Sequence, residues 1–235
     1  MRIKVLTILL AGMLGSLPMM AGDHGEMPGG PGEVAVLGIG GQNRTWSGYG
    51  GGALQATIPI TEKMSLKAGL QGLSSGVMTG LLQFQPAFPF SKGELFIDAS
   101  AYYGGFYKYH TGEWLAAAGA GWRAAHFSAQ LGLSVRWIAG GSDVVVEPID
   151  LFYRIAGSLN KADAQWNLTA GVANFTHYQV ERAMQPIFFI EGRYTFTSRL
   201  SLIGEIDVKP AGMFHLTATW YGFSAALGLS YRIGL

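Results

Sequence analysis

Hydrophobic and polar residues alternate along most of this chain. From Arg199 to Lys209 the odd positions are mainly polar or charged, whereas the even positions between them are apolar or Gly. The same alternation recurs between residues 127 and 137 and again from 223 to 235. A period of two is that of a β-strand, whose successive side chains point to opposite faces. The pattern therefore predicts strands with one polar and one apolar face.

Turn-forming residues divide the chain into about twelve such segments. They lie near 34–41, 48–59, 64–74, 77–88, 94–107, 113–125, 127–138, 149–159, 164–174, 186–197, 199–209 and 219–234. Connections after even segments are short, and several after odd segments are longer, which is typical of membrane barrels. We therefore predict an all-β fold, a single antiparallel transmembrane β-barrel of about twelve strands over residues 34–235. A soluble β-sandwich, which also alternates, is the alternative.

Aromatic residues and small residues favour the barrel over the sandwich. The polar face is often Gly, Ala or Ser, as at Gly119 and Gly132, which suits a narrow lumen and leaves room between long side chains. Aromatic residues gather where segments end, as in the girdles of membrane barrels. One predicted girdle contains Trp46, Trp114, Trp137 and Trp220, and the other contains Trp122, Phe127, Trp166 and Phe196.

Two prolines fit this pattern less well. Pro86 and Pro89 fall inside or just after the fourth segment, and Pro cannot donate a ladder hydrogen bond. We expect that strand either to stop near Gln85 or to carry a bulge.

The N-terminus has the order of a secretory signal peptide. Arg2 and Lys4 precede an apolar stretch that Gly15 and Pro18 break, and Ala21 offers a cleavage site. We expect residues 1–21 to be the signal and residues 22–33 to be a flexible leader. A membrane anchor is the alternative for the first segment. His24 lies between two acidic residues of the leader, but a solvated tail is the simpler interpretation, because ordering it around a metal ion costs entropy.

Composition narrows the function classes. The 235 residues are 49% hydrophobic and 13% charged, and they include 35 Gly and no Cys. The absence of Cys excludes disulfides, thiol catalysis and thiolate metal sites. The chain has 16 Lys and Arg and 15 Asp and Glu. Two of the basic residues lie in the expected signal peptide, so the mature chain is nearly neutral. We therefore expect no nucleic-acid partner.

The last segment, GFSAALGLSYRIGL, has hydrophobic residues at every second position up to the C-terminus. Together with the signal peptide and the aromatic girdles, it resembles bacterial outer-membrane β-barrel proteins. The resemblance implies location in the bacterial outer membrane, contact with its lipid and insertion by the barrel-assembly machinery. In that class the final strand commonly ends in Phe, whereas this chain ends in Leu235.

Candidate catalytic groups are sparse. His126-Phe127-Ser128 resembles the His-x-Ser pair of outer-membrane lipid A deacylases, but Ala129 stands where that family shows Asn, and the pair falls at a periplasmic turn. The loop residues Asp143, Glu147, Asp150, His177 and His215 could suggest a protease or an ion site, but their spacing is not diagnostic. We expect no enzyme, no cofactor and no metal site.

Alternation directs a set of charged and amide side chains into the lumen. These candidate lumen residues are Lys67, Gln83, Asp98, Arg123, Arg136, Arg154, Glu191, Arg193, Glu205, Asp207 and Arg232. If they are hydrated, they line a narrow porin-like channel for small solutes. If they are paired, they close a structural or surface-interaction barrel, which is the alternative.

Two further expectations concern pairs and loops. We expect Arg193 to pair with Glu205, and Glu191 to lie near Arg232 or Lys209. We expect the external loops to include Gln42 to Ser47, Ala139 to Pro148 and Phe175 to Gln185.

Overall fold

The computed structural model describes residues 32–42, 47–90, 92–107, 110–140, 143–160, 165–178, 180–210 and 222–233. The expected signal peptide, most of the expected leader, Trp46, Trp220 and His215 lie outside these ranges. The strands are β1 (Gly32–Gln42), β2 (Gly48–Thr61), β3 (Met64–Leu73), β4 (Val77–Phe90), β5 (Gly93–Phe106), β6 (Thr111–Ala124), β7 (Phe127–Gly140), β8 (Asp143–Val146), β9 (Asp150–Asn160), β10 (Trp166–Ala173), β11 (Ile187–Thr195), β12 (Leu200–Val208) and β13 (Phe223–Ile233). Within the described ranges, no helix is long and apolar enough to cross a membrane.

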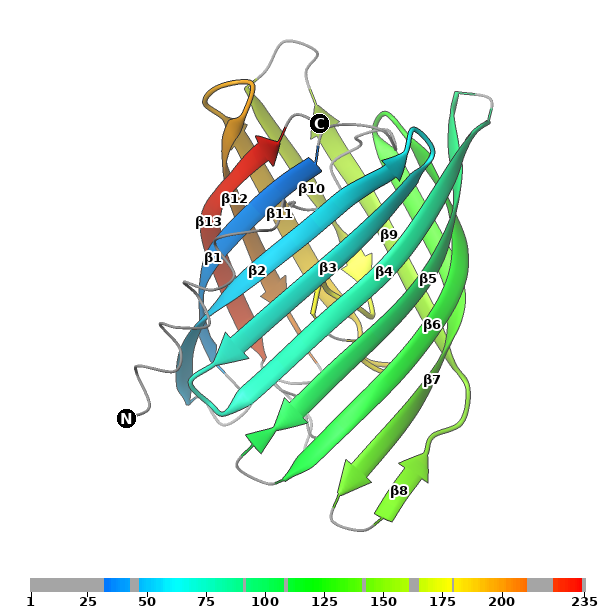
Figure 1. Cartoon of the computed structure of the whole chain (residues 1–235), viewed down its shortest axis with the longest axis vertical. Coiled ribbons are helices and arrows are strands. Elements are labelled where there is room, and N and C mark those ends of the chain that lie inside the picture. Colours follow the sequence, from blue (N-terminus) through cyan, green and yellow to red (C-terminus); the bar gives the residue numbers. More distant parts are fainter. Residues whose placement is uncertain are drawn as a thin grey trace.

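The strands form a closed antiparallel barrel (Figure 1). Each strand pairs with its neighbour in sequence, except that β7 pairs with β9 as well as with the short strand β8. The ring closes where β1 pairs with β13, from Gly32 opposite Ile233 to Gln42 opposite Phe223. Since β8 adds to β7 outside the ring, twelve strands form the barrel. The predicted fold is confirmed, and the sandwich alternative is wrong.

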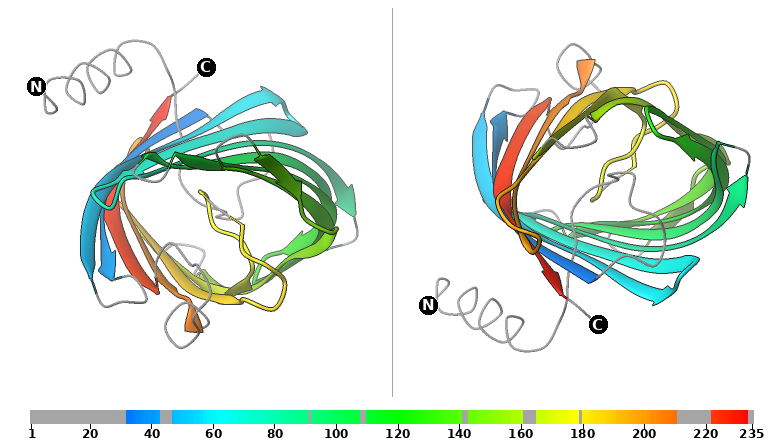
Figure 2. Two further views of the ribbon diagram at one scale, coloured as in Figure 1. Left: turned by 90° about the horizontal axis from the view of Figure 1, so that it is seen from below. Right: turned by 90° about the horizontal axis from the view of Figure 1, so that it is seen from above.

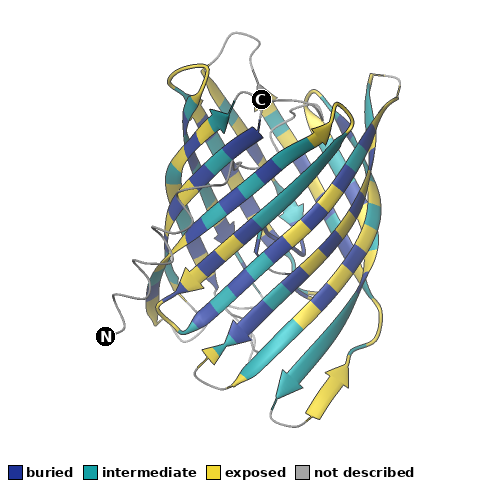
Figure 3. Ribbon diagram, viewed as in Figure 1, coloured by how far each residue is buried: buried dark blue, intermediate teal, exposed yellow. Residues whose placement is uncertain are grey.

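Burial alternates along the strands in the sense expected of a membrane barrel (Figure 3). On β7, Leu131 and Leu133 are 62% and 54% exposed on the outer face, whereas Gln130 and Ser134 are buried in the lumen. The outer face is therefore apolar and the lumen holds most polar side chains, the reverse of a soluble protein.

This orientation predicts a face-dependent cost of inserting charge. Leu133→Arg should lower the free energy of unfolding by roughly 2–4 kcal/mol, because it places a cation in lipid near the middle of a strand. Leu133→Met at the same position should have little effect. Equilibrium denaturation in lipid vesicles measures both. Equal losses for the two variants would show that Leu133 does not face lipid.

Strand boundaries agree with the expected ones to within a few residues, with three differences. The short strand β8 lies within residues 139–148, which we expected to form an external loop. β1 begins at Gly32, inside the segment expected as leader, so Glu33 belongs to the barrel. β4 continues past both prolines to Phe90. It also keeps its register with β5, because Phe84 pairs with Ala99 and Ala87 with Phe96. The strand therefore neither stops at Gln85 nor bulges against β5.

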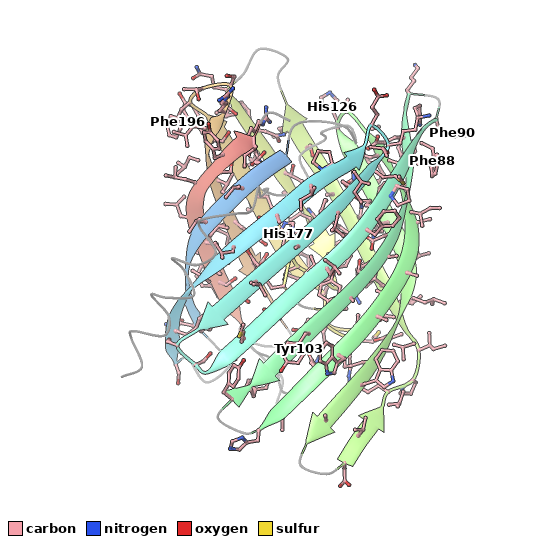
Figure 4. All side chains as sticks on the ribbon, viewed as in Figure 1. Phe88, Phe90, Tyr103, His126, His177 and Phe196 are labelled. Carbon is pink, nitrogen blue, oxygen red and sulfur yellow. The ribbon has the colours of Figure 1, made fainter. Side chains whose placement is uncertain are left out.

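Aromatic side chains mark both rims of the barrel. Figure 4 shows Phe88, Phe90 and Phe196 at one end and Tyr103 toward the other. Tyr103 contacts Trp114, with ring centroids 4.5 Å apart. At the opposite rim, Trp122 contacts Phe127 at 6.2 Å. The described members of the predicted girdles thus include contacting aromatic pairs.

Seen end-on, the barrel is oval (Figure 2). Gly119 of β6 lies opposite Gly132 of β7. A Cβ on Gly132 would lie 2.3 Å from the carbonyl oxygen of Ala118 and 2.6 Å from the Gly119 Cα. These glycines therefore allow two backbones to approach closely.

Candidate functional site

The connection between β10 and β11, described over residues 174–178 and 180–186, folds into the barrel, and we call it the inner loop. Figure 2 shows it in yellow crossing the interior. Phe175, Tyr178 and Val180 are buried, whereas Met184 is 89% exposed where the chain returns to the rim. The prediction that Phe175 to Gln185 forms an external loop is therefore wrong. The physical reason is that its large apolar side chains find apolar partners inside the lumen.

Hydrogen bonds fix the shape of the inner loop. Phe175 forms an antiparallel bridge with Val180, and the Glu181 N–H donates to the Asn174 carbonyl at 2.6 Å. The Asn174 side chain donates to the Leu151 carbonyl at 2.7 Å and accepts from the Tyr153 N–H at 2.8 Å. The loop is thus a hairpin attached to β9 at its base.

Apolar side chains hold the inner loop against two walls. Phe175 stacks on Phe152 of β9 with ring centroids 4.0 Å apart. Tyr178 packs in a second cluster that includes Leu37 of β1 and Ile203 of β12. Gln55 donates to the Tyr178 hydroxyl at 2.6 Å, and burial raises the pKa of this phenol well above its usual range. The loop therefore bridges the lumen between apolar patches.

Gly69 of β3 makes room for the inner loop. A Cβ there would lie 3.0 Å from the backbone oxygen of His177 and 3.5 Å from the Tyr178 ring. Gly72 on the same strand would meet nothing within 4 Å.

Gly69→Leu is therefore expected to displace the loop. Overpacking costs about 1–3 kcal/mol, so amide hydrogen exchange in residues 174–186 should become several-fold faster. Gly72→Leu should leave the exchange unchanged. Hydrogen-exchange mass spectrometry measures both, and equal protection in the two variants would show that the loop does not press on β3.

Two small cavities border the inner loop. The larger is lined partly by Lys67, Gln83, Gln130, Arg154 and His177. The smaller has a mostly apolar lining that includes Leu115, Tyr178 and Val180, with Thr79 and Glu113. The inner loop thus takes part in the lining of both spaces.

Charged side chains at the rim near the chain termini form two buried groups. Arg193 donates to both carboxylate oxygens of Glu33, at 2.5 and 3.0 Å, and Arg232 lies 3.5 Å from the same carboxylate. Arg123 donates to Glu94 at 2.8 Å and to Gln85 at 3.4 Å.

A second layer lies deeper in the barrel. Asp98 accepts hydrogen bonds from Gln83, Ser100 and Gln130. Arg154 donates to both oxygens of Glu191, at 2.8 and 2.9 Å. His177 of the inner loop, labelled near the middle of the barrel in Figure 4, places its Nε2 3.8 Å from Glu191.

A third group joins the other end of the inner loop to the wall. Lys209 donates to Glu181. Arg136 donates to the Val180 carbonyl at 2.6 Å and to Glu113 at 3.4 Å, and Arg182 pairs with Glu147. The loop residue Glu147 therefore takes part in an ion-pair network.

The structure corrects the expected ion pairs. Arg193 pairs with Glu33 instead of Glu205, and Glu191 pairs with Arg154 instead of Arg232 or Lys209. In the register, Glu191 faces Glu205 and Arg193 faces Ile203. Arg193 extends toward β1, where Glu33 had been assigned to the leader.

The candidate His-x-Ser pair lies at the rim. His126 occupies the turn between β6 and β7, with its Nδ1 3.3 Å from the backbone oxygen of Ser158. Figure 4 shows it at the end of the barrel, distant from the inner loop.

Solved structures share this architecture. An outer-membrane channel from Pseudomonas putida F1 aligns with a TM-score of 0.55 and 12% identity, covering 91% of this chain and 99% of that one. The NanC porin aligns with a TM-score of 0.54 and 10% identity, covering 85% and 100% of the two chains. The KdgM porin, solved in complex with oligogalacturonate, aligns at 0.51 and 8% identity, covering 86% and 99%.

The chain has the outer-membrane β-barrel fold. No protein-family model and no curated protein matches its sequence. Sequence identities as low as these support a shared fold and nothing more, so the function of this outer-membrane barrel has to be inferred from the residues of its lumen.

Proposed function

We propose that this protein is a narrow porin-like channel of the bacterial outer membrane for small polar solutes, and that the inner loop closes its lumen. The observation that carries the proposal is the inner loop itself, which lies inside a continuous ring of strands and lines two small cavities there. A twelve-stranded ring is wider than the eight-stranded barrels that side chains alone can fill. Displacing the loop would open the middle of the lumen.

The lumen charges indicate the class of solute. Arginine, lysine and carboxylate groups are interspersed along the wall, so neither sign dominates. Such a lining favours small polar or zwitterionic solutes over strongly charged polymers. The KdgM porin was solved with oligogalacturonate, but at 8% identity we do not assign that acidic ligand to this chain.

The topology also suggests the orientation. Short connections lie at the rim that holds the ends of β1 and β13, and short turns are periplasmic in outer-membrane barrels. We infer that this rim faces the periplasm and that the inner loop enters from the outer side. Cleavage after Ala21, contact with outer-membrane lipid and insertion by the barrel-assembly machinery complete the proposal, which includes no catalytic role.

A closed structural barrel is the second candidate. The buried ion pairs favour it, because a paired lumen needs no hydration. The two candidates differ in whether solutes cross the barrel.

Planar-bilayer recording separates them. The channel should give small, discrete current steps, and Lys67→Glu should shift selectivity toward cations, because Lys67 lines the larger cavity. Lys63→Glu, in the exposed turn after β2, should leave selectivity unchanged. Correctly folded protein that stays silent under all voltages and with the inner loop removed would establish the structural barrel.

A further inference from the structure

One group of side chains links the inner loop to the barrel wall and offers metal-ligand chemistry. His177 belongs to the loop, Glu191 to β11 and Glu205 to β12. One ligand atom from each lies within 4.8 Å of the other two. We propose that these three residues form a divalent-cation site that fastens the inner loop to the wall.

The register creates the site. Glu191 and Glu205 are directly opposite each other on paired strands and point to the same face. Like charges in that position are destabilising unless something compensates them. Arg154 compensates Glu191 through its bidentate contact. The cation between Glu191 and Glu205 compensates both carboxylates and brings in the loop imidazole.

A second observation places a buried acceptor beside this group. Asp207, two residues after Glu205 on the same face of β12, is buried. Its Oδ1 has no hydrogen-bond partner. A buried carboxylate oxygen without a donor is costly, and a cation bound between Glu191 and Glu205 would lower that cost.

The donor set selects the class of ion. Imidazole nitrogen with carboxylate oxygen suits Zn²⁺ and similar first-row ions, whereas Ca²⁺ and Mg²⁺ prefer oxygen alone. Zinc bonds of about 2.0–2.2 Å place ligand atoms roughly 3.3 Å apart in a tetrahedron. The His177 and Glu191 atoms are 3.8 Å apart and all three ligand atoms lie within 4.8 Å of one another, so zinc binding requires the side chains to move closer by up to about 1.5 Å. The site lies beside the larger cavity, which His177 and Arg154 also line, so ions in the lumen reach it.

The test is a zinc titration of the full, tag-free protein folded in detergent, after removal of metals with a chelator. The wild type should bind one Zn²⁺ saturably, and His177→Gln and Glu205→Gln should each weaken binding at least about tenfold. His126→Gln, at the exposed rim turn, is the matched control and should bind like the wild type. Heat-modifiable gel migration confirms that each variant folds. His177 is a loop residue, so its variant leaves the wall intact.

The outcomes are distinct. No saturable Zn²⁺ binding by the wild type, or equal binding by His177→Gln, overturns the cation site. A Ca²⁺ affinity above that for Zn²⁺ and independent of His177 overturns the choice of ion and of ligand.

The role of the site as a fastening for the loop rests on the proposed channel, but the binding measurement does not. If zinc binds through His177 and no variant conducts, the cation site stands and the channel proposal fails. If the channel conducts, Zn²⁺ should lengthen its closed intervals in the wild type and not in His177→Gln. Equal closed intervals in the two would overturn the fastening role.

Discussion

Replacing residues 175–185 with a short Gly-Ser linker is expected to raise single-channel conductance several-fold. The inner loop fills the middle of the lumen through Phe175, Tyr178 and Val180, so its removal opens that part of the lumen. The ring should persist, because every wall strand keeps its ladder. Ala173 and Ile187 are paired across β10 and β11, so a few residues suffice to connect them. Planar-bilayer recording of refolded protein provides the measurement.

The matched control removes a connection that lies outside the ring. β8 pairs with β7 alone, and its residues Val144 to Val146 are exposed. Replacing residues 143–146 with the same linker should leave conductance at the wild-type level. If the conductance rises equally in both variants, the increase results from shortening any connection, and the inner loop does not limit the conductance.

Glu33→Gln is expected to cause the largest loss of stability from a single substitution. The Glu33 side chain is fully buried and contacts both Arg193 and Arg232. Removing its charge deprives the buried Arg193 guanidinium of its bidentate carboxylate partner. Breaking a buried ion pair by removing one partner costs about 3–5 kcal/mol, and we expect that loss in the free energy of unfolding. Denaturant titration in lipid vesicles measures it.

A double-mutant cycle identifies the partner. Arg193→Met combined with Glu33→Gln should cost clearly less than the sum of the single substitutions, because the double variant lacks the Arg193 charge that Glu33→Gln alone leaves without its carboxylate. Glu62→Gln, in the exposed turn between β2 and β3, should change stability by less than about 0.5 kcal/mol. Additive losses for Glu33 and Arg193 would show that their contact contributes nothing.

The fold could be predicted from the sequence because a barrel repeats one simple rule. Each strand has to present apolar side chains to lipid, as β7 does with Leu131 and Leu133. Apolar and polar residues therefore alternate in every segment. The number of strands and their order follow from the turns between them. Pro86 was the exception, since the sequence does not show that β4 can pass through it without a change of register.

The candidate site was predictable only in part. Alternation directed Arg154, Glu191 and Arg193 inward, but ion pairs across a lumen depend on the tilt and closure of the barrel, which no local pattern encodes. Glu33 was missed because β1 starts within a Gly-rich and Pro-rich stretch.

The inner loop was missed for a related reason. A connection of that length is typical of an external loop, and only the closed barrel shows apolar walls at the height of Phe175 and Tyr178. The unusual density of large apolar side chains in this connection is the signal that could have indicated burial.

Cysteine accessibility during current recording tests most directly whether the inner loop closes a conducting lumen. The chain contains no Cys, so a thiol introduced at Thr176, which lines the larger cavity, is unique. We predict that a water-soluble thiol reagent modifies Thr176→Cys slowly and reduces the current as it reacts. Asp143→Cys, on exposed β8, should react fast without changing the current. Equally fast reaction at both positions, with no change in current at either, would contradict the account.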